Sequence, residues 1–189
     1  MRPDDVILDH AVFRVLLRAM SRPGTVHPLP FDAAQDDGLA YIAGLLRCVA
    51  DNEAAFCVLG PCEPGAGGEI ARRTGGREAP AGEADIVIAL SGTTGGTAGS
   101  IRRGSLEFPE KGATVVYRVD ALAPDGGTES LSGPGIESAL RPRIAGLGDG
   151  ELGFLKEANA AFPLGVDAIF VDRAGQVACI PRSTRIGGP

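Results

Sequence analysis

The segment ADIVIAL, residues 84–90, limits the choice of fold more than any other part of the chain. It is apolar nearly throughout and lacks the polar alternation of a strand that has one face in water. Such a run is typical of a strand that is covered on both faces of its sheet. The segment AAFCVLG, residues 54–60, indicates a second buried strand. A sheet with both faces covered requires other elements, usually helices, above and below it.

Apolar residues at helical spacing predict the helices that would cover this sheet. We expect helices over residues 9–20, 35–51 and 149–162, and a short one over residues 67–76. In the helix at 149–162, Asp149 is predicted to be the N-cap, and Pro163 to end the helix. Its buried face should be formed by Leu152, Leu155, Ala158 and Phe162.

Further strands are predicted later in the chain. Residues 113–122 indicate one strand and residues 129–136 a short one, while residues 166–172 and 177–181 flank a turn and indicate a hairpin. Helices and buried strands alternate, and an antiparallel pair comes late, so the pattern predicts an α/β three-layer sandwich with a mixed central sheet. No linker is long enough to divide the chain, which predicts a single domain over residues 1–189.

The first helix is expected to end abruptly at the sequence SRPGT, residues 21–25. Pro23 disfavours a helical conformation of Arg22, and Pro23-Gly24 suits the two central positions of a type II turn. The second central residue of such a turn has a positive φ, so Gly24 is predicted to be required for its backbone.

Composition and charge exclude several classes of protein. The chain has 189 residues, of which 44% are hydrophobic, and a net charge of −6, which argues against a surface for nucleic acid or an anionic membrane. No apolar run approaches the ~20 residues of a membrane span. The start MRPDDVILDH carries acids and lacks the apolar core of a secretory signal, so a cytoplasmic setting is expected.

The cysteines and histidines do not form the spacing of a metal site. There are four cysteines and two histidines, and no Cys-x-x-Cys pair is present. Cys48, Cys57 and Cys179 lie in apolar helical or strand patterns, so buried free thiols are expected. We therefore predict that the chain binds no metal.

The glycine-rich segment SGTTGGTAGS, residues 91–100, follows a predicted strand and precedes Arg102 and Arg103. Such a loop can hold a phosphate with its backbone N–H groups, but this one has neither dinucleotide-binding nor P-loop spacing. A plain connection is the alternative. No Gly-x-Ser-x-Gly elbow is present, and no carboxylates are persuasively paired, so no catalytic residue is predicted.

Five side chains are candidates for contacts with a ligand or a partner. Asp167 lies at a helix-to-strand turn, where it either contacts a ligand or hydrogen-bonds the backbone of the turn. Arg182 and Arg185 follow the last predicted strand. They either contact an anion or an acidic side chain of a partner, or they are solvated. Arg14 and Arg18 are one helical turn apart, so their charges repel each other. Either an acidic neighbour offsets this repulsion, or both side chains face solvent.

Several blocks, taken in order, resemble one family. They are FRVLLRAMSRPGT, FPEKGATVVYRV, LSGPGI, FPLGVDAIFVD and IPRSTR, and together they extend from about Phe13 to Arg185. The same order is seen in the PhnH family, the H subunit of the bacterial carbon–phosphorus lyase core complex. The resemblance implies a fold like the large domain of pyridoxal-phosphate-dependent transferases, with no cofactor retained. It also implies a helix within residues 93–100, whereas the glycines there favour a loop.

The resemblance further implies a function in phosphonate use. In that family the H subunit joins the G, I and J subunits, and with an ATPase-like L subunit the machinery couples an alkylphosphonate such as methylphosphonate to the ribose of ATP. Adenine leaves, and a ribose 1-phosphonate 5-triphosphate forms. The implied role of this chain is structural or accessory, with self-association into a homodimer when it is isolated. The alternative is a stand-alone enzyme or binding protein for an anionic nucleotide or phosphonate.

No cofactor is expected from the residues either. A Schiff base with pyridoxal phosphate needs a lysine held in a pocket. The chain has only Lys111, in a predicted turn, and Lys156, which should point away from the core face of its helix.

Overall fold

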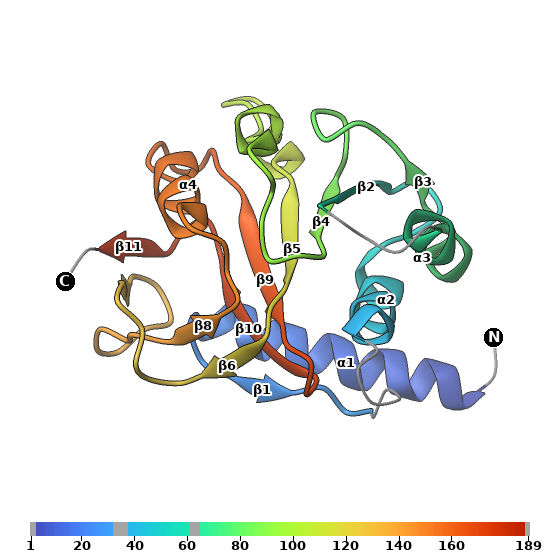
Figure 1. Ribbon diagram of the computed structural model, residues 1–189, viewed down its shortest axis with the longest axis horizontal. Coiled ribbons are helices and arrows are strands. Elements are labelled where there is room, and N and C mark those ends of the chain that lie inside the picture. Colours follow the sequence, from blue (N-terminus) through green and yellow to red (C-terminus); the bar gives the residue numbers. More distant parts are fainter. Residues whose placement is uncertain (1–2, 32–37, 61–64, 188–189) are drawn as a thin grey trace.

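The structure, a computed structural model, describes residues 3–31, 38–60 and 65–187. Helices and strands alternate along the chain, and most strands join one central sheet (Figure 1). The helices of the described residues are α1 (Pro3–Ser21), α2 (Gly38–Val49), α3 (Ala66–Thr74) and α4 (Glu151–Ala158), with the 3-10 helices η1 (Thr97–Ser100) and η2 (Pro109–Lys111). The strands are β1 (His27–Pro28), β2 (Ala55–Leu59), β3 (Arg77–Glu78), β4 (Ile86–Ala89), β5 (Thr114–Arg118), β6 (Ala121–Ala123), β7 (Ser130–Ser132), β8 (Arg143–Ala145), β9 (Asp167–Val171), β10 (Gln176–Ile180) and β11 (Arg185–Gly187).

The central sheet has seven strands in the order β1-β10-β9-β5-β4-β2-β3. Strands β3, β2, β4, β5 and β9 run parallel to their neighbours, and β10 and β1 are added antiparallel at one side. In register, Val116 of β5 lies opposite Ile88 of β4 and Ile169 of β9. The predicted α/β class with a mixed central sheet is therefore confirmed.

The predicted hairpin is strands β9 and β10. Its turn is organised by Asp172, which is 3% exposed. One carboxylate oxygen of Asp172 accepts hydrogen bonds from the backbone N–H groups of Ala174 and Gln176, and the other accepts one from Leu122. A single buried carboxylate thus closes the hairpin and joins it to β6.

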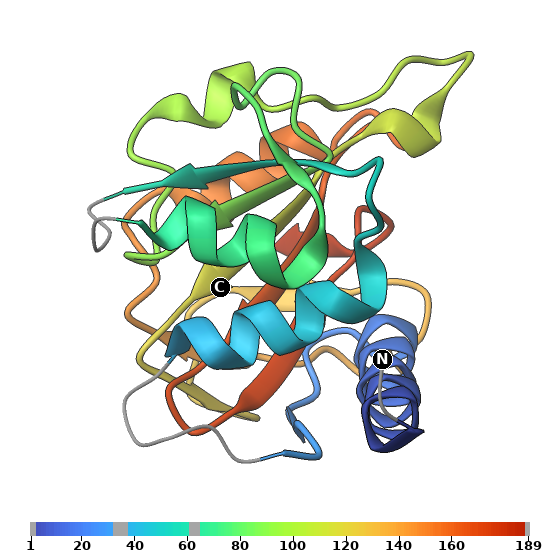
Figure 2. The same ribbon diagram turned by 90° about the vertical axis from the view of Figure 1, so that its right-hand side faces the viewer.

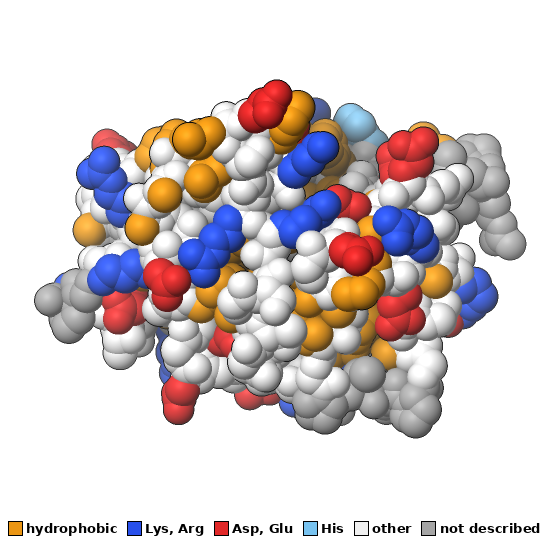
Figure 3. Space-filling view, turned by 90° about the horizontal axis from the view of Figure 1, so that it is seen from above, with side chains coloured by type: hydrophobic (Ala, Val, Ile, Leu, Met, Phe, Trp, Pro, Cys, Tyr) orange, Lys and Arg blue, Asp and Glu red, His pale blue; other side chains and the backbone are white. Residues whose placement is uncertain are grey.

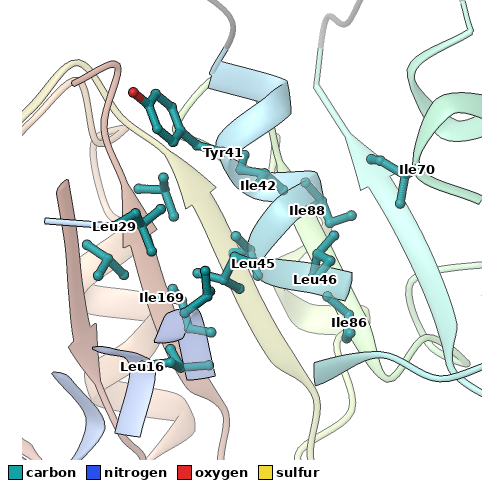
Figure 4. Packing of buried hydrophobic residues seen from close by; sticks show 14 of the residues in the cluster. Leu16, Leu29, Tyr41, Ile42, Leu45, Leu46, Ile70, Ile86, Ile88 and Ile169 are labelled. Carbon is teal, nitrogen blue, oxygen red and sulfur yellow. The ribbon is translucent and has the colours of Figure 1, made fainter. Parts of the chain in front are cut away.

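Two hydrophobic clusters cover the two faces of the sheet. On one face α1, α2 and α3 pack against β4, β5 and β9, and Figure 4 shows Leu16, Leu45 and Leu46 beside Ile88 and Ile169. On the other face α4 packs against alternate residues of the same strands. Figure 2 shows α2 and α3 in front of the sheet and α4 behind it. Because β4 is buried on both faces, its apolar run has no polar alternation.

Helix α1 begins at Pro3, before the predicted start at residue 9, and its Val12, Leu16 and Ala19 are buried as expected. The turn that follows it is confirmed. Gly24 has a φ of 82°, and the N–H of Thr25 donates to the carbonyl of Arg22 over 3.2 Å. The N–H of Gly24 donates to the carbonyl of Cys179 of β10, so the turn fastens the end of the helix to the sheet.

The structure corrects the prediction for α4. The N-cap is Gly150, in the left-handed conformation and without a side-chain cap, so the assignment of Asp149 was wrong. The helix ends at Ala158, four residues before the expected end, because Asn159 closes its last turn. Leu155 and Ala158 are buried as predicted, but Phe162 lies beyond the helix and is 63% exposed.

The predicted strand over residues 113–122 is two strands. Strand β5 ends at Arg118 and belongs to the central sheet, whereas β6 pairs with β8 in a separate two-stranded sheet. Strands β7 and β11 form a second small sheet. The chain turns between β5 and β6 at Asp120, whose N–H donates to the carbonyl of Ala145 of β8. The small sheets join segments distant in the sequence, and a local pattern does not reveal such pairs.

The segment 93–100 is part loop and part short helix. Gly95 and Gly96 have positive φ angles of 62° and 81°, and only residues 97–100 form the 3-10 helix η1. Residues 35–37 of the predicted second helix, and Cys62, lie outside the described residues. Within the residues that are described, no helix combines the length and the apolar character needed to cross a bilayer.

Candidate functional site

Asp167 and Arg182, two of the residues singled out from the sequence, form an ion pair with each other. Asp167 begins β9, and Arg182 follows β10. Nη2 and Nε of Arg182 donate to Oδ2 of Asp167 over 2.6 and 3.0 Å. Oδ1 of Asp167 also accepts a hydrogen bond of 2.8 Å from the backbone N–H of Arg182. Both side chains are largely buried, so the pair is rigidly held.

Arg182 also fastens a third segment. Its Nη1 donates to the carbonyl of Pro109 over 2.6 Å, and its Nη2 donates to the carbonyl of Gly112 over 3.2 Å. All three guanidinium nitrogens therefore have protein partners. The arrangement joins the start of β9, the end of β10 and the segment that leads into β5, and its geometry is that of a structural clamp.

The clamp lies at the amino ends of the parallel strands. Ligands of open α/β sheets gather at the opposite edge, outside the carboxyl ends. Seen from above in Figure 3, acidic and basic side chains are interleaved over the middle of this face, and hydrophobic side chains gather beside them. The sequence left two interpretations of Asp167 open, a ligand contact or a hydrogen bond to the backbone of its own turn; the contacts found are instead with the backbone and guanidinium of Arg182, 15 residues away.

A pocket of about 730 Å³ adjoins the clamp. Its walls are the end of α4, the Gly133-Pro134 turn after β7 and the segment from Arg182 to Ile186. Lys156 and Arg185 are cationic side chains of this lining that form no ion pair with any described residue. Among the residues that the structure describes, no Asp or Glu side chain lines the pocket. Of the five candidate residues, this pocket brings together Arg182 and Arg185.

The glycine-rich loop after β4 holds an anionic group, but that group belongs to the chain itself. The carboxylate is that of Glu151, the first residue of α4, which is 5% exposed. Its Oε1 accepts hydrogen bonds from the hydroxyls of Thr93 and Thr94 over 2.8 and 2.9 Å, and from the N–H of Thr94 over 2.7 Å. Its Oε2 accepts one of 2.8 Å from the hydroxyl of Tyr117.

This Glu151 network lies at the carboxyl ends of β4 and β5, the edge where α/β folds hold ligands. Burial, followed by the adjacent Glu151 carboxylate, raises the pKa of Tyr117, so its hydroxyl stays protonated and donates. The Tyr117 ring stacks on Phe170 with centroids 5.2 Å apart. Sequence analysis missed Glu151. The available signals were an acid in the first turn of a predicted helix and a Thr-rich loop after a predicted strand, but the sequence does not show that the two lie together.

The two arginines after the loop are also engaged. Arg102 pairs with Asp85, and Arg103 pairs with Glu157. With Glu151 in the loop and both arginines paired, the segment is arranged as an internal connection rather than an open phosphate cradle.

Arg14 and Arg18 are exposed on α1 and form no ion pair with a described residue. They border a stripe of exposed apolar side chains made of Val6, Phe13 and Leu17, which flanks the buried face of the helix. We call this stripe the outer face of α1. The apolar surface of α1 is therefore wider than the part that packs on the sheet.

Among the residues that the structure describes, no three His, Cys, Asp or Glu side chains are grouped so that they could hold a metal ion. Burial raises the pKa of Cys48 to about 11, and burial also raises the pKa of Cys57 and of Cys179. Burial, and then Arg18 and Arg22, lower the pKa of His27.

Comparison with known proteins places the chain among proteins of phosphonate metabolism. A family model described as "Bacterial phosphonate metabolism protein (PhnH)" matches residues 4–187. The chain is also similar to a relative from Stutzerimonas stutzeri, the "Putative C-P lyase subunit protein HtxG". The two are 36% identical over 174 residues, which is 92% of this chain and 83% of the relative.

Proposed function

Because the chain belongs to the PhnH family of bacterial phosphonate metabolism proteins, we propose that it is a subunit of a carbon–phosphorus lyase complex. The observation that carries this proposal is the match over residues 4–187, together with a relative that is itself named as a C-P lyase subunit. The extent of the match also supports one PhnH-like domain for residues 1–189.

In this proposal the chain is an accessory subunit of the assembly that couples ATP to an alkylphosphonate and releases adenine. Its partners are core subunits of the G, I and J types. Displacing adenine from ribose requires an acid close to the cationic centre that develops on the sugar. Asp167 was the acid best placed from the sequence, and its two oxygens are engaged by Arg182. This engagement supports an accessory role rather than a catalytic one for Asp167.

The surface that we assign to partner binding is the outer face of α1. Its Leu17 is 52% exposed and its Phe13 is 42% exposed, while Arg14 and Arg18 lie beside them without acidic partners among the described residues. An apolar stripe with a cationic border suits a partner surface that is apolar at its centre and acidic at its rim. In the isolated protein, the same face would be covered by a second copy in a homodimer.

Reconstitution tests the accessory role. ATP and methylphosphonate are incubated with this protein alone, with the G, I, J and L subunits alone, and with the full set, and free adenine is measured. We expect adenine only with the full set, and an Asp167→Asn variant should reduce it no more than its lower stability explains. Adenine release by this protein alone, above that of Asp167→Asn, would contradict the proposal.

Two variants of exposed leucines test the assigned surface. Leu17→Ser should reduce co-purification with the partner subunits and shift the isolated protein toward the 19.3 kDa monomer in light scattering. Leu106→Ser is the matched control, because Leu106 is 80% exposed and lies far from α1 in the sequence. If both variants co-purify and self-associate like the unmodified protein, another surface binds the partners.

We also propose, from the family, that the fold is related to the large domain of pyridoxal-phosphate-dependent transferases without use of the cofactor. Lys111 lies in the short helix η2, and Lys156, although it lines the pocket beside α4, is an exposed side chain. Neither is enclosed in the way that a Schiff-base lysine requires. An aldimine absorbance band in the purified protein, trapped on either lysine by borohydride, would contradict the absence of the cofactor.

A further inference from the structure

The second half of α1 and the turn after it carry a row of cationic groups. Arg14 and Arg18 lie on α1, and Arg22 follows one helical turn later, because its N–H donates to the carbonyl of Arg18 over 3.0 Å. All three side chains are exposed, and none forms an ion pair with a described residue. A spacing of four residues places them along one side of the helix. In a protein with a net charge of −6, this row is a local exception.

His27 adjoins the same row. It lies in β1, the strand at the edge of the sheet that packs beside α1 (Figure 1). The hydroxyl oxygen of Thr25 lies 2.7 Å from the carbonyl oxygen of Arg22 and 2.8 Å from Nε2 of His27. Burial, and then the charges of Arg18 and Arg22, lower the pKa of His27, so both arginines are close enough to act on the imidazole. We call Arg14, Arg18, Arg22 and His27 the basic row.

The contacts of Thr25 decide which nitrogen of His27 takes up a proton. The hydroxyl of Thr25 has one hydrogen, which it donates to the carbonyl of Arg22, so its oxygen accepts from Nε2 of His27. In the neutral ring Nε2 therefore carries the hydrogen and Nδ1 carries the lone pair. Nδ1 makes no hydrogen bond with a described residue. Protonation of His27 thus adds both a charge and an unused N–H donor to the basic row.

The charged groups around the imidazole leave the basic row positive. Strand β10, which pairs with β1, contains no charged residue. In the turn before β10, Asp172 has both oxygens engaged by backbone N–H groups, and Arg173 pairs with Asp120. The segment 131–142 packs against the turn after α1 and carries Glu137 and Arg141, whose charges are opposite. None of these groups neutralises the arginines of the basic row.

The basic row runs beside the outer face of α1, and the two together indicate what covers them. From Arg14 to Arg22 the row extends over about 12 Å of the helix axis, which is longer than one carboxylate or phosphate group can cover. Phe13 and Leu17 are exposed next to it, and a free anion would leave their apolar surface in water. A protein segment that carries several acids beside apolar side chains matches both features.

We propose that the basic row binds an acidic segment of a partner subunit, and that protonation of His27 tightens this contact. The proposal rests on the proposed function, because it takes the partner from the carbon–phosphorus lyase subunits. It adds the turn at residues 21–25 to the partner surface and makes assembly depend on pH. A carboxylate beside His27 favours the charged imidazole, so the pKa of His27 should be higher in the complex than in the free protein. The affinity should then be highest at low pH, and should fall as the pH rises through the pKa of the complex.

The test measures binding of this protein to the assembled G, I and J subunits by surface plasmon resonance at pH 6.0 and 8.0. Uptake of one proton changes an affinity by up to about tenfold per pH unit, so we expect binding at least threefold tighter at pH 6.0. His27→Gln should lose this difference. Calorimetry in two buffers of different protonation enthalpy should also show that His27→Gln takes up fewer protons on binding than the unmodified protein.

Charge variants test the arginines of the basic row. Arg18→Gln and Arg22→Gln should each lower the affinity about two- to fivefold, mainly through slower association. They should also reduce the loss of affinity between about 50 and 300 mM salt, because fewer charges remain to be screened. Arg185→Gln is the matched control, since Arg185 is exposed and unpaired among the described residues but lines the pocket beside α4. It should bind like the unmodified protein.

The outcomes separate this proposal from the proposed function. Binding that neither the arginine variants nor His27→Gln alter would leave the chain a lyase subunit, and would overturn the basic row as its contact. A pH difference that His27→Gln retains in full would overturn the role of its protonation. Arginine variants that change self-association in light scattering, but not binding to the G, I and J subunits, would show that a second copy covers the row, which also overturns the proposal. If the unmodified protein does not bind these subunits at either pH, the proposed function is wrong as well.

Discussion

Replacing Glu151 by Gln tests whether the buried carboxylate network holds the glycine-rich loop to α4. The substitution keeps the size of the side chain but removes its charge and turns one acceptor into a donor. Four donors contact the carboxylate at 2.7–2.9 Å, from Thr93, Thr94 and Tyr117. The amide can accept at one oxygen only, so the Tyr117 hydroxyl or the loop loses its acceptor.

The expected cost follows from the hydrogen bonds that the substitution weakens or removes. Hydrogen bonds to a charged group contribute about 1.5–3 kcal/mol each, and a buried donor left without a partner costs about 1–3 kcal/mol. Because these effects are not additive, we expect Glu151→Gln to lower the free energy of unfolding by about 3 kcal/mol. For a chain of this size that corresponds to a fall in melting temperature of roughly 6–12 °C.

The assay is urea unfolding followed by circular dichroism, with Glu157→Gln as the control. Glu157 is on the same helix, but its side chain is 76% exposed and pairs with Arg103 at 3.3 Å. Exposed pairs contribute about 0–1 kcal/mol, so the control should differ little from the unmodified protein. A double-mutant cycle with Tyr117→Phe should give a coupling of about 1 kcal/mol or more. Equal costs for the two Glu variants, or no coupling, would refute the network.

Three further outcomes are expected. Gly24→Val should lower the free energy of unfolding by roughly 1–3 kcal/mol, because Gly24 has a φ of 82°, whereas Thr25→Ser should melt like the unmodified protein. The lowered pKa of His27 means that the folded state resists protonation, so the free energy of unfolding should fall as the pH drops below about 6.5. The fall should be smaller in His27→Gln, and chemical unfolding at pH 7.5 and 5.5 measures both. Asp167→Asn should cost about 1–3 kcal/mol by urea unfolding, because three donors of Arg182 lose a charged acceptor; no change would show that the clamp is dispensable.

The elements that sequence analysis predicted correctly are those whose signal is local. The run at residues 84–90 contains β4, the spacing of Val12, Leu16 and Ala19 marks the buried face of α1, and Pro23-Gly24 marks its end. Each of these signals comes from a few neighbouring residues and from the steric rules that act on them. The mixed sheet followed from such elements, because buried parallel strands and one late hairpin leave few arrangements.

The polar contacts were not predictable in the same way. Thr93 and Glu151 are 58 residues apart, and Arg182 reaches the carbonyl of Pro109 across 73 residues. Side chains so distant in sequence come into contact only in the folded sheet. The hydrophobic periodicity of the sequence predicts helices and strands, but it does not predict which polar side chains pair. Sequence analysis could therefore nominate Asp167 and Arg182 separately, but it could not show that they neutralise each other.

The internal pairing of these groups narrows where function can reside. At the carboxyl ends of β4 and β5 the loop is filled by Glu151, and at the amino ends Asp167 is engaged by Arg182. The unpaired groups described above lie instead on the outer face of α1 and in the pocket beside α4. These two places are formed by different elements, so a variant in one should not affect the property that depends on the other. Leu17→Ser should weaken co-purification with the partner subunits, whereas Lys156→Gln should leave it unchanged. If Lys156→Gln also weakens co-purification, the pocket beside α4 belongs to the partner surface, and our assignment of that surface to α1 is wrong.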